Sequence, residues 1–189
     1  MLRIAEFEKV SFYAFKKSIE KAYKMDSSST IMREYALYSS DDTLQRIYDN
    51  IKIPSRSTKR SAGYDFFYPF GETLILPKES LIVPSGIKVR ILENINFDFY
   101  LGIYTRSSLG FYNRIKQDDT VAIIDADYYN TGEEEGNIFI HLRNEHPNKT
   151  FKLKNGSKIA QGIFQIYGVT LSDNTTEDRN GGLGSTTSI

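Results

Sequence analysis

The spacing of apolar residues changes once along this chain, and that change limits what the chain can fold into. Up to about residue 51 the apolar residues recur every three or four positions, the period of amphipathic helices. The two clearest stripes are Phe12, Phe15, Ile19, Ala22 and Tyr23, and Leu44, Ile47, Tyr48 and Ile51. From about Ile53 onward the period is two, which is typical of β-strands. We therefore predict short helices first and strands for the rest of the chain.

Residues that favour breaks and turns divide both regions. In the helical region, serine-rich stretches at residues 27–29 and 39–42 predict breaks, with N-caps at the helix starts. In the second region, turn residues recur at roughly ten-residue spacing, at 69–71, 77–78, 84–86 and 155–156. No helix-length segment interrupts that region, which disfavours an α/β fold. The predicted class is all-β, an antiparallel sandwich or barrel.

The overall composition excludes several functions. Among 189 residues, Lys plus Arg number 24 and Asp plus Glu number 24, so the basic excess of a duplex-binding protein is missing and we expect no nucleic-acid partner. Cysteine is absent, which removes disulfides, thiolate nucleophiles and Cys-based metal sites. No apolar run approaches 18 residues and the first ten residues are rich in charge, so we expect a cytoplasmic protein with no membrane partner.

Five polar segments, most of them with glycine, interrupt the strand pattern. They are SAGYD at 61–65, RSSLG at 106–110, AIIDADY at 122–128, GSKIAQ at 156–161 and RNGGLGST at 179–186. The arginine, hydroxyls and glycine of the second segment suit a triphosphate because all of them supply donors. Asp125 and Asp127 follow an apolar pair and are expected two positions apart on a strand, pointing the same way, as candidates for a general base. Taken singly, each segment also fits a turn, a surface carboxylate pair or a disordered tail.

In this order, AGYD, RSSLG, IIDADY, GSKIAQ and RNGGLGST resemble the five motifs of the trimeric dUTP diphosphatases (dUTPases), over about residues 53–186. The resemblance implies a distorted jelly-roll β-barrel and a homotrimer whose active sites are shared among subunits. It also implies Mg2+-dependent hydrolysis of dUTP to dUMP and pyrophosphate, which lowers dUTP and supplies dUMP for dTTP synthesis. The expected organisation is a first strand (1–10), a helical insertion (11–52), a jelly-roll core (53–177) and a mobile glycine-rich arm (178–189).

The resemblance also implies a set of site residues. Asp125 is the general base for the water that attacks the α-phosphorus, and Asp65 holds Mg2+ through its water shell. Tyr128 lies against the deoxyribose and excludes a 2′-hydroxyl, and Arg179 closes over the γ-phosphate. The implied phosphate-binding residues are Arg106, Ser107, Ser108, Gln161, Arg179, Gly184, Ser185 and Thr186. The implied base- and sugar-binding residues are Asp119, Thr120, Val121, Ile124, Tyr128 and Leu183.

Several features depart from the family pattern. Asp119 stands where an asparagine is frequent, which leaves open a dual dUTP and dCTP diphosphatase, and Leu183 replaces a stacking phenylalanine. An insertion at Tyr129–Glu135 ends in three glutamates and is expected to be a solvated hairpin tip. With the helical insertion, it resembles a branch from low-GC bacteria and their phages, some of whose members act as regulators through protein binding.

A dCTP deaminase, which shares the fold, is disfavoured. Its essential glutamate corresponds to His141, and it would lack the AGYD segment. We expect His141 and His146 to be structural or at the surface, because no partner spacing indicates a metal site.

Overall fold

The computed structural model describes residues 3–25, 40–93, 96–179 and 181. Within these ranges the helices are α1 (Phe12–Met25), α3 (Asp41–Asp49), α4 (Ser107–Asn113) and the 3₁₀ turn η1 (Ala126–Tyr128). The strands are β1 (Ala5–Lys9), β2 (Ser55–Arg56), β3 (Tyr64–Phe67), β4 (Thr73–Ile75), β5 (Ser80–Pro84), β6 (Ile87–Ile91), β7 (Asp98–Thr105), β8 (Ile115–Gln117), β9 (Ala122–Ile124), β10 (Phe139–Asn144), β11 (Phe151–Leu153) and β12 (Lys158–Tyr167).

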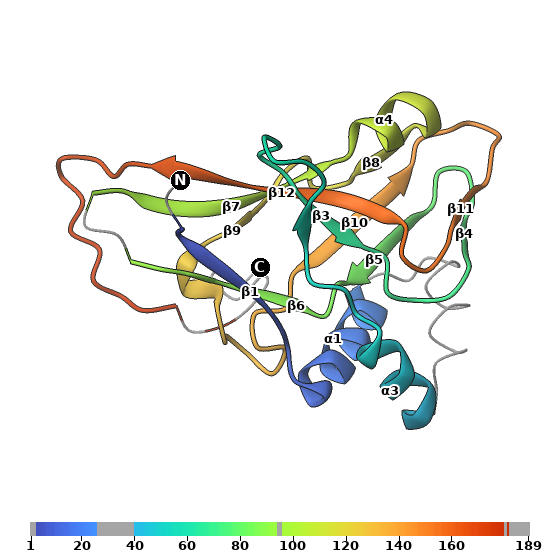
Figure 1. Ribbon diagram of the computed structural model, residues 1–189, viewed down its shortest axis with the longest axis horizontal. Coiled ribbons are helices and arrows are strands. Elements are labelled where there is room, and N and C mark those ends of the chain that lie inside the picture. Colours follow the sequence, from blue (N-terminus) through green and yellow to red (C-terminus); the bar gives the residue numbers. More distant parts are fainter. Residues whose placement is uncertain (1–2, 26–39, 94–95, 180, 182–189) are drawn as a thin grey trace.

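The strands pair in antiparallel fashion throughout the described part of the chain, which confirms the predicted all-β class. The largest sheet has the order β2-β3-β12-β7-β9, and a second sheet has the order β5-β10-β8. Two further pairs, β1-β6 and β11-β4, complete the strand arrangement. In Figure 1 the long β12 runs beside β7, while α1 and α3 lie together below the strands.

Two short helical elements interrupt the strand region, where none was expected. The helix α4 begins directly after β7 and ends at Arg114, whose backbone is left-handed with φ 53°. The turn η1 follows β9 because the amide of Tyr128 donates to the carbonyl of Asp125 at 3.1 Å. The expectation that both aspartates of the third motif lie on a strand is therefore wrong: β9 ends at Ile124, before the first of them.

Serine caps begin both N-terminal helices. The Ser11 hydroxyl accepts the Ala14 amide at 3.1 Å, and Ser40 accepts the Thr43 amide at 3.3 Å. The cap at Ser40 confirms the prediction made for residues 39–42. The break predicted at residues 27–29 lies outside the described residues.

The two helices share the hydrophobic core of the strands. The ring of Phe15 is fully buried and stacks on Phe70 with 6.0 Å between centroids. From the other helix, the Tyr48 hydroxyl donates to the carbonyl of Val10 at 2.7 Å. The buried face of α1 agrees with the predicted stripe at three positions, but Tyr23 is 43% exposed. The helical segment therefore packs against the strands of its own chain.

The glutamate-rich insertion at Tyr129–Glu135 contacts α1, contrary to the expectation of a solvated tip. Glu133 accepts a hydrogen bond from the Tyr13 hydroxyl at 3.1 Å, and Glu134 pairs with Lys21 at 3.0 Å. Both partners lie on α1, so the helix supplies a hydroxyl and a positive charge to the insertion. This pairing could not be read from the local sequence because the contacting residues are more than 100 positions apart.

The third glutamate, Glu135, joins the insertion to the strands as well. Its carboxylate lies 3.0 Å from the Lys88 ammonium on β6 and accepts the Ser11 amide at 3.0 Å. Lys88 is mostly buried and also donates to Asn130 at 2.6 Å. Burial alone would raise the pKa of Glu135, but the hydrogen bonds from Ser11 and Lys88 outweigh it and lower that pKa below its ordinary value.

Replacing Glu135 by Gln should lower the free energy of unfolding by about 2 kcal/mol at pH 7, because the buried Lys88 ammonium loses its counter-charge. Urea denaturation measures this. The native contribution is complete above the ordinary glutamate pKa of 4.5 and is lost as pH falls through the lowered folded value, so wild type and variant should converge in acid. The exposed Glu133→Gln is the control; an equal loss in both variants would contradict the argument.

Candidate functional site

A buried carboxylate, Asp65, organises the first group of predicted site residues. It lies on β3 and is 1% exposed. One carboxylate oxygen accepts the Ser57 hydroxyl at 2.6 Å and lies 2.7 Å from the Lys158 ammonium. The other lies 3.1 Å from Nε of Arg106 and accepts the Gln161 amide at 3.4 Å. The structure thus brings together the predicted residues of the first, second and fourth motifs.

The charge of Asp65 is balanced by its neighbours. Burial alone would raise its pKa, but the hydrogen bonds from Lys158 and Ser57 and the charge of Arg106 lower the pKa below the ordinary value. Asp65 therefore remains a carboxylate and holds Arg106 at the end of β7. Ser107 and Ser108 follow at the exposed start of α4. This arrangement presents an arginine and two hydroxyls to solvent, a donor set that suits phosphate oxygens.

A cavity of about 280 Å³ forms the second group. Its lining residues are Met25, Ile82, Asp119, Ala122, Ile123, Ile124, Tyr128, Phe139 and His141. Three of the predicted base- and sugar-binding residues, Asp119, Ile124 and Tyr128, are among them, and most of the others are apolar. Such a cavity, apolar with few polar groups, is typical of small-molecule sites.

The other six lining residues were not predicted as site residues, and Met25 and His141 are the most informative of them. Met25 is the last residue of α1, so the helical segment contributes to this cavity. His141, expected to be structural or at the surface, lies on β10 on the same face as Phe139, because residues two apart on a strand share a face. The alternation of side chains along a strand could have shown that Phe139 and His141 share a face. No motif, however, marked either residue as part of a site.

The turn between β8 and β9, beside the cavity, contains a strained residue. Thr120 has φ 65°, in the left-handed region that a β-branched residue rarely adopts. It lies between Asp119 and Val121, and the Val121 amide donates to the Asp119 carbonyl at 2.7 Å across it. Val121 is half-buried and does not line the cavity. The left-handed turn at Thr120 thus separates Asp119, which lines the cavity, from Val121, which does not.

The two carboxylates of the third motif meet Arg179. Its Nη1 lies 3.3 Å from Asp125 and 2.9 Å from Asp127, and its guanidinium carbon lies 5.3 Å from the ring centre of Tyr128. Tyr128 is 5% exposed and donates its hydroxyl to the carbonyl of Asn137 at 3.1 Å. Burial, followed by the charge of Glu134, raises the pKa of Tyr128 to about 12. Predicted catalytic, sugar-binding and arm residues thus converge at one place.

The phosphate-binding group around Arg106 and the carboxylate pair of Asp125 and Asp127 lie far apart within a single chain. β9 pairs with β7 so that Ile124 faces Leu101, and Asp125 continues toward the start of β7. Arg106 follows the far end of β7. At about 3.3 Å per residue, the phosphate-binding group and the carboxylate pair are separated by about 20 Å along this strand. The remaining predicted residues, Leu183, Gly184, Ser185 and Thr186, lie outside the described residues.

Within the described ranges, no group of three or more His, Cys, Asp or Glu side chains is arranged to hold a metal ion. Over the same ranges, no helix combines the length and apolar character needed to cross a membrane.

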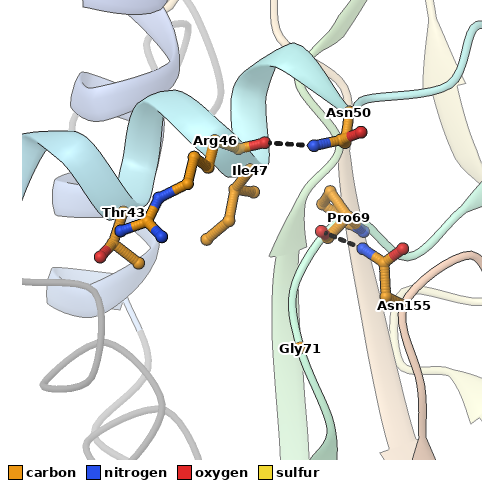
Figure 2. Close-up of a pocket in the computed structure, with 7 residues that line it drawn as sticks. All are labelled: Thr43, Arg46, Ile47, Asn50, Pro69, Gly71 and Asn155. Atoms are coloured by element: carbon orange, nitrogen blue, oxygen red, sulfur yellow. Dashed lines mark hydrogen bonds between the residues drawn. The ribbon is translucent and has the colours of Figure 1, made fainter.

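A larger hollow of about 420 Å³ lies between α3 and the segments around Pro69 and Asn155. Figure 2 shows Asn50 and Asn155 bonded to the carbonyls of Arg46 and Pro69 at its edge. It contains none of the predicted site residues.

Comparison with known proteins identifies the class to which this fold and site belong. The crystal structure of a dUTPase from Streptococcus mutans superimposes with a TM-score of 0.53 at 30% identity, over 62% of this chain and 88% of that one. The dUTPase from phage phi11 of S. aureus superimposes with a TM-score of 0.54 at 19% identity, over 68% of this chain and 92% of that one, and shares the fold. The architecture is therefore the dUTPase-like jelly roll, as predicted.

The sequence comparisons identify the family. The dUTPase family model matches residues 49–187. The deoxyuridine 5′-triphosphate nucleotidohydrolase of Lactococcus lactis is 34% identical over 139 residues, 72% of this chain and 88% of that protein. The protein of the same description from Blochmanniella floridana is 38% identical over 126 residues, 66% and 77% of the two chains. The chain belongs to the dUTPase family, which confirms the motif-based prediction.

Replacing Thr120 by Gly should stabilise the protein by about 1 kcal/mol, because glycine adopts φ 65° without the penalty carried by a β-branched side chain. For a chain of this size, that corresponds to a rise in Tm of about 2–4 °C by calorimetry. Thr170→Gly, at a position with negative φ, is the control and should not raise Tm. A lower Tm for Thr120→Gly would mean that the threonine makes a compensating contact.

Proposed function

We propose that this protein hydrolyses dUTP to dUMP and pyrophosphate, with Asp125 as the general base. The observation that carries the proposal is the convergence of Asp125, Tyr128 and Arg179 at the end of the apolar cavity. It joins a carboxylate, a wall for the sugar and a cation for phosphate within one short region. Membership in the dUTPase family supplies the substrate class.

Asp125, Arg179 and Tyr128 have separate roles in the proposed reaction. The Asp125 carboxylate is about half exposed, so it can orient a water molecule and take its proton as oxygen attacks the α-phosphorus. Pyrophosphate then leaves with the electrons of the broken phosphorus–oxygen bond. Arg179 exchanges Asp125 and Asp127 for the negative phosphates when the nucleotide binds, which frees the base and neutralises the charge of the leaving group. The buried ring of Tyr128 forms the wall against which the deoxyribose lies.

A complete site requires more than one copy of the chain. The phosphate-binding group around Arg106 lies about 20 Å along β7 from Asp125, too far for both to contact one nucleotide. On one face of the sheet that joins them, the large apolar side chains of Ile123 and Tyr167 are exposed, and Val169 and Leu171 are exposed just after β12. We propose that this surface is buried in a homotrimer, in which one subunit supplies the phosphate group and another the base cavity.

The proposed cofactor is Mg2+, carried by the triphosphate. Mg2+ is usually bound through one or two carboxylates together with substrate phosphates, which suits a site without a dedicated ligand cluster in the described residues. The surroundings of Asp65 do not fit a metal contact in the free chain, because Lys158 and Arg106 already balance its charge and its side chain is 2% exposed. The metal-holding role of Asp65 stays a prediction.

Pyrophosphate release from dUTP, dCTP, dTTP and UTP, measured with and without EDTA, tests the proposal. Rapid release from dUTP alone is the expected result. Comparable release from dCTP would favour a dual diphosphatase, the alternative that Asp119 in the cavity wall leaves open. Nucleotide binding without any release would overturn the proposed reaction and favour a regulatory dUTPase-like protein.

Replacing Asp125 by Asn should lower kcat for dUTP by at least about 100-fold, because the water loses its proton acceptor. Calorimetric binding of dUMP should change little, since the side chain keeps its shape. Asp173→Asn, an exposed aspartate in a turn after β12, is the control and should leave both quantities unchanged. Retained turnover in Asp125→Asn would remove this residue as the base.

Ending the chain after Asp178 should lower turnover by a similar factor, because Arg179 is removed. The thermal unfolding temperature should stay within a few degrees, since Arg179 bonds to two exposed carboxylates that contribute little to stability. Light scattering would reveal the oligomeric state. A loss of the oligomer in place of a loss of turnover would contradict the proposed role of the arm.

A further inference from the structure

His141 lies beside the turn between β8 and β9 that carries Asp119. In β10 it pairs with Ile82 of β5, and both side chains line the same cavity. Its carbonyl accepts the amide of Asp118 at 2.9 Å, so the strand and the turn are bonded directly next to Asp119. The backbone of His141 is therefore fixed at the wall of the cavity by the neighbouring strand β5 and by the turn.

The imidazole is the available hydrogen-bond donor among the nine lining side chains. The Tyr128 hydroxyl donates to the carbonyl of Asn137, and the Asp119 carboxylate can only accept. The remaining six lining side chains carry no N–H or O–H group. Nε2 of His141 is shielded from solvent and lies 3.6 Å from the Asp118 carboxylate, an ion-pair contact without a hydrogen bond. The hydrogen-bonding capacity of the ring is therefore incompletely used, and a ligand in the cavity that His141 lines can satisfy it.

The cavity has a direction that fits a nucleoside. Tyr128, the proposed sugar wall, is bonded at Asn137, and His141 lies four residues further along the same stretch of chain. At about 3.3 Å per residue of extended chain, His141 lies about 13 Å from Asn137, where the Tyr128 hydroxyl is bonded. With the sugar at Tyr128, the far end of a pyrimidine ring points toward His141. That far end is position 4, which lies across the ring from the nitrogen that carries the sugar.

We propose that His141 is a specificity-determining residue that donates a hydrogen bond to the 4-carbonyl of uracil, while Asp119 accepts the N3 hydrogen. This rests on the proposed function. Cytosine in the same position would present a lone pair to the carboxylate and an amino group to the imidazole donor, so both contacts would be mismatched. Asp119 and His141 thus distinguish uracil from cytosine by which group donates and which accepts each hydrogen bond. A single asparagine side chain could supply both the acceptor and the donor.

The test compares two replacements of His141 with a control at the other histidine. His141→Leu keeps similar bulk and removes the donor, whereas His141→Gln keeps an N–H donor. His146→Gln is the control, because His146 lies in a turn and does not line the cavity. For each protein, kcat and KM are measured for dUTP and dCTP, and binding of dUMP and dCMP is measured by calorimetry. Thermal melting verifies that each variant is folded.

His141→Leu should raise KM for dUTP and weaken dUMP binding by about tenfold, with kcat within about threefold, because the contact is far from the reacting phosphorus. The preference for dUTP over dCTP should fall by a similar factor. His141→Gln should retain most of the preference, and His146→Gln all of it. An equal loss for both nucleotides, or no rescue by Gln, would overturn the proposal.

Binding of dUMP and dCMP tests the His141 contact independently of the proposed hydrolysis, on which the contact rests. A wild-type chain that binds dUMP but releases no pyrophosphate would overturn the proposed hydrolysis, while the preference for dUMP over dCMP would still report on His141. A wild-type chain that hydrolyses dUTP, with a His141→Leu variant of unchanged preference, would overturn the His141 contact alone.

Discussion

The pairing of β7 with β12 determines where every group of the site lies. Eight consecutive residue pairs, from Thr105 with Ala160 to Asp98 with Tyr167, hold the two strands in one register. One end of the ladder positions Arg106 and Gln161 around the buried Asp65, and β9 is bonded nearer the other end, before Asp125. Because a shift of one residue would turn each side chain to the opposite face, this register cannot vary without dismantling the site.

Charge is arranged differently at the two ends of this ladder. Around Asp65, a fully buried carboxylate is neutralised inside the chain, so its surroundings are complete without a ligand. Around Asp125 and Asp127, two half-exposed carboxylates share one arginine from the arm. Exposed ion pairs contribute little to stability and exchange partners readily. The first end therefore has a permanent geometry, whereas the second is poised to change partners when phosphates arrive.

The sequence singled out candidate site residues more readily than the residues around them. Arg106, Asp125 and Gln161 stood out because phosphate binding and proton transfer demand particular residue types in recognisable segments, and their roles stay predictions. Met25 and His141 belong to ordinary helical and strand patterns, and their place in the cavity depends on how α1 packs against β5 and β10. The docking of the glutamate-rich insertion on α1 depends on contacts across more than 100 residues, which local patterns do not record.

That docking makes the two insertions of this chain dependent on each other. Three adjacent carboxylates, Glu133 to Glu135, lie a few residues beyond Asp125, the proposed base. Tyr13 and Lys21 of the helical segment contact the first two of them. A family member with the acidic insertion but without the helix would carry unopposed negative charge next to a site that must bind a triphosphate. The helix and the acidic insertion therefore form one structural unit, because deleting the helix would leave Glu133 without Tyr13 and Glu134 without Lys21.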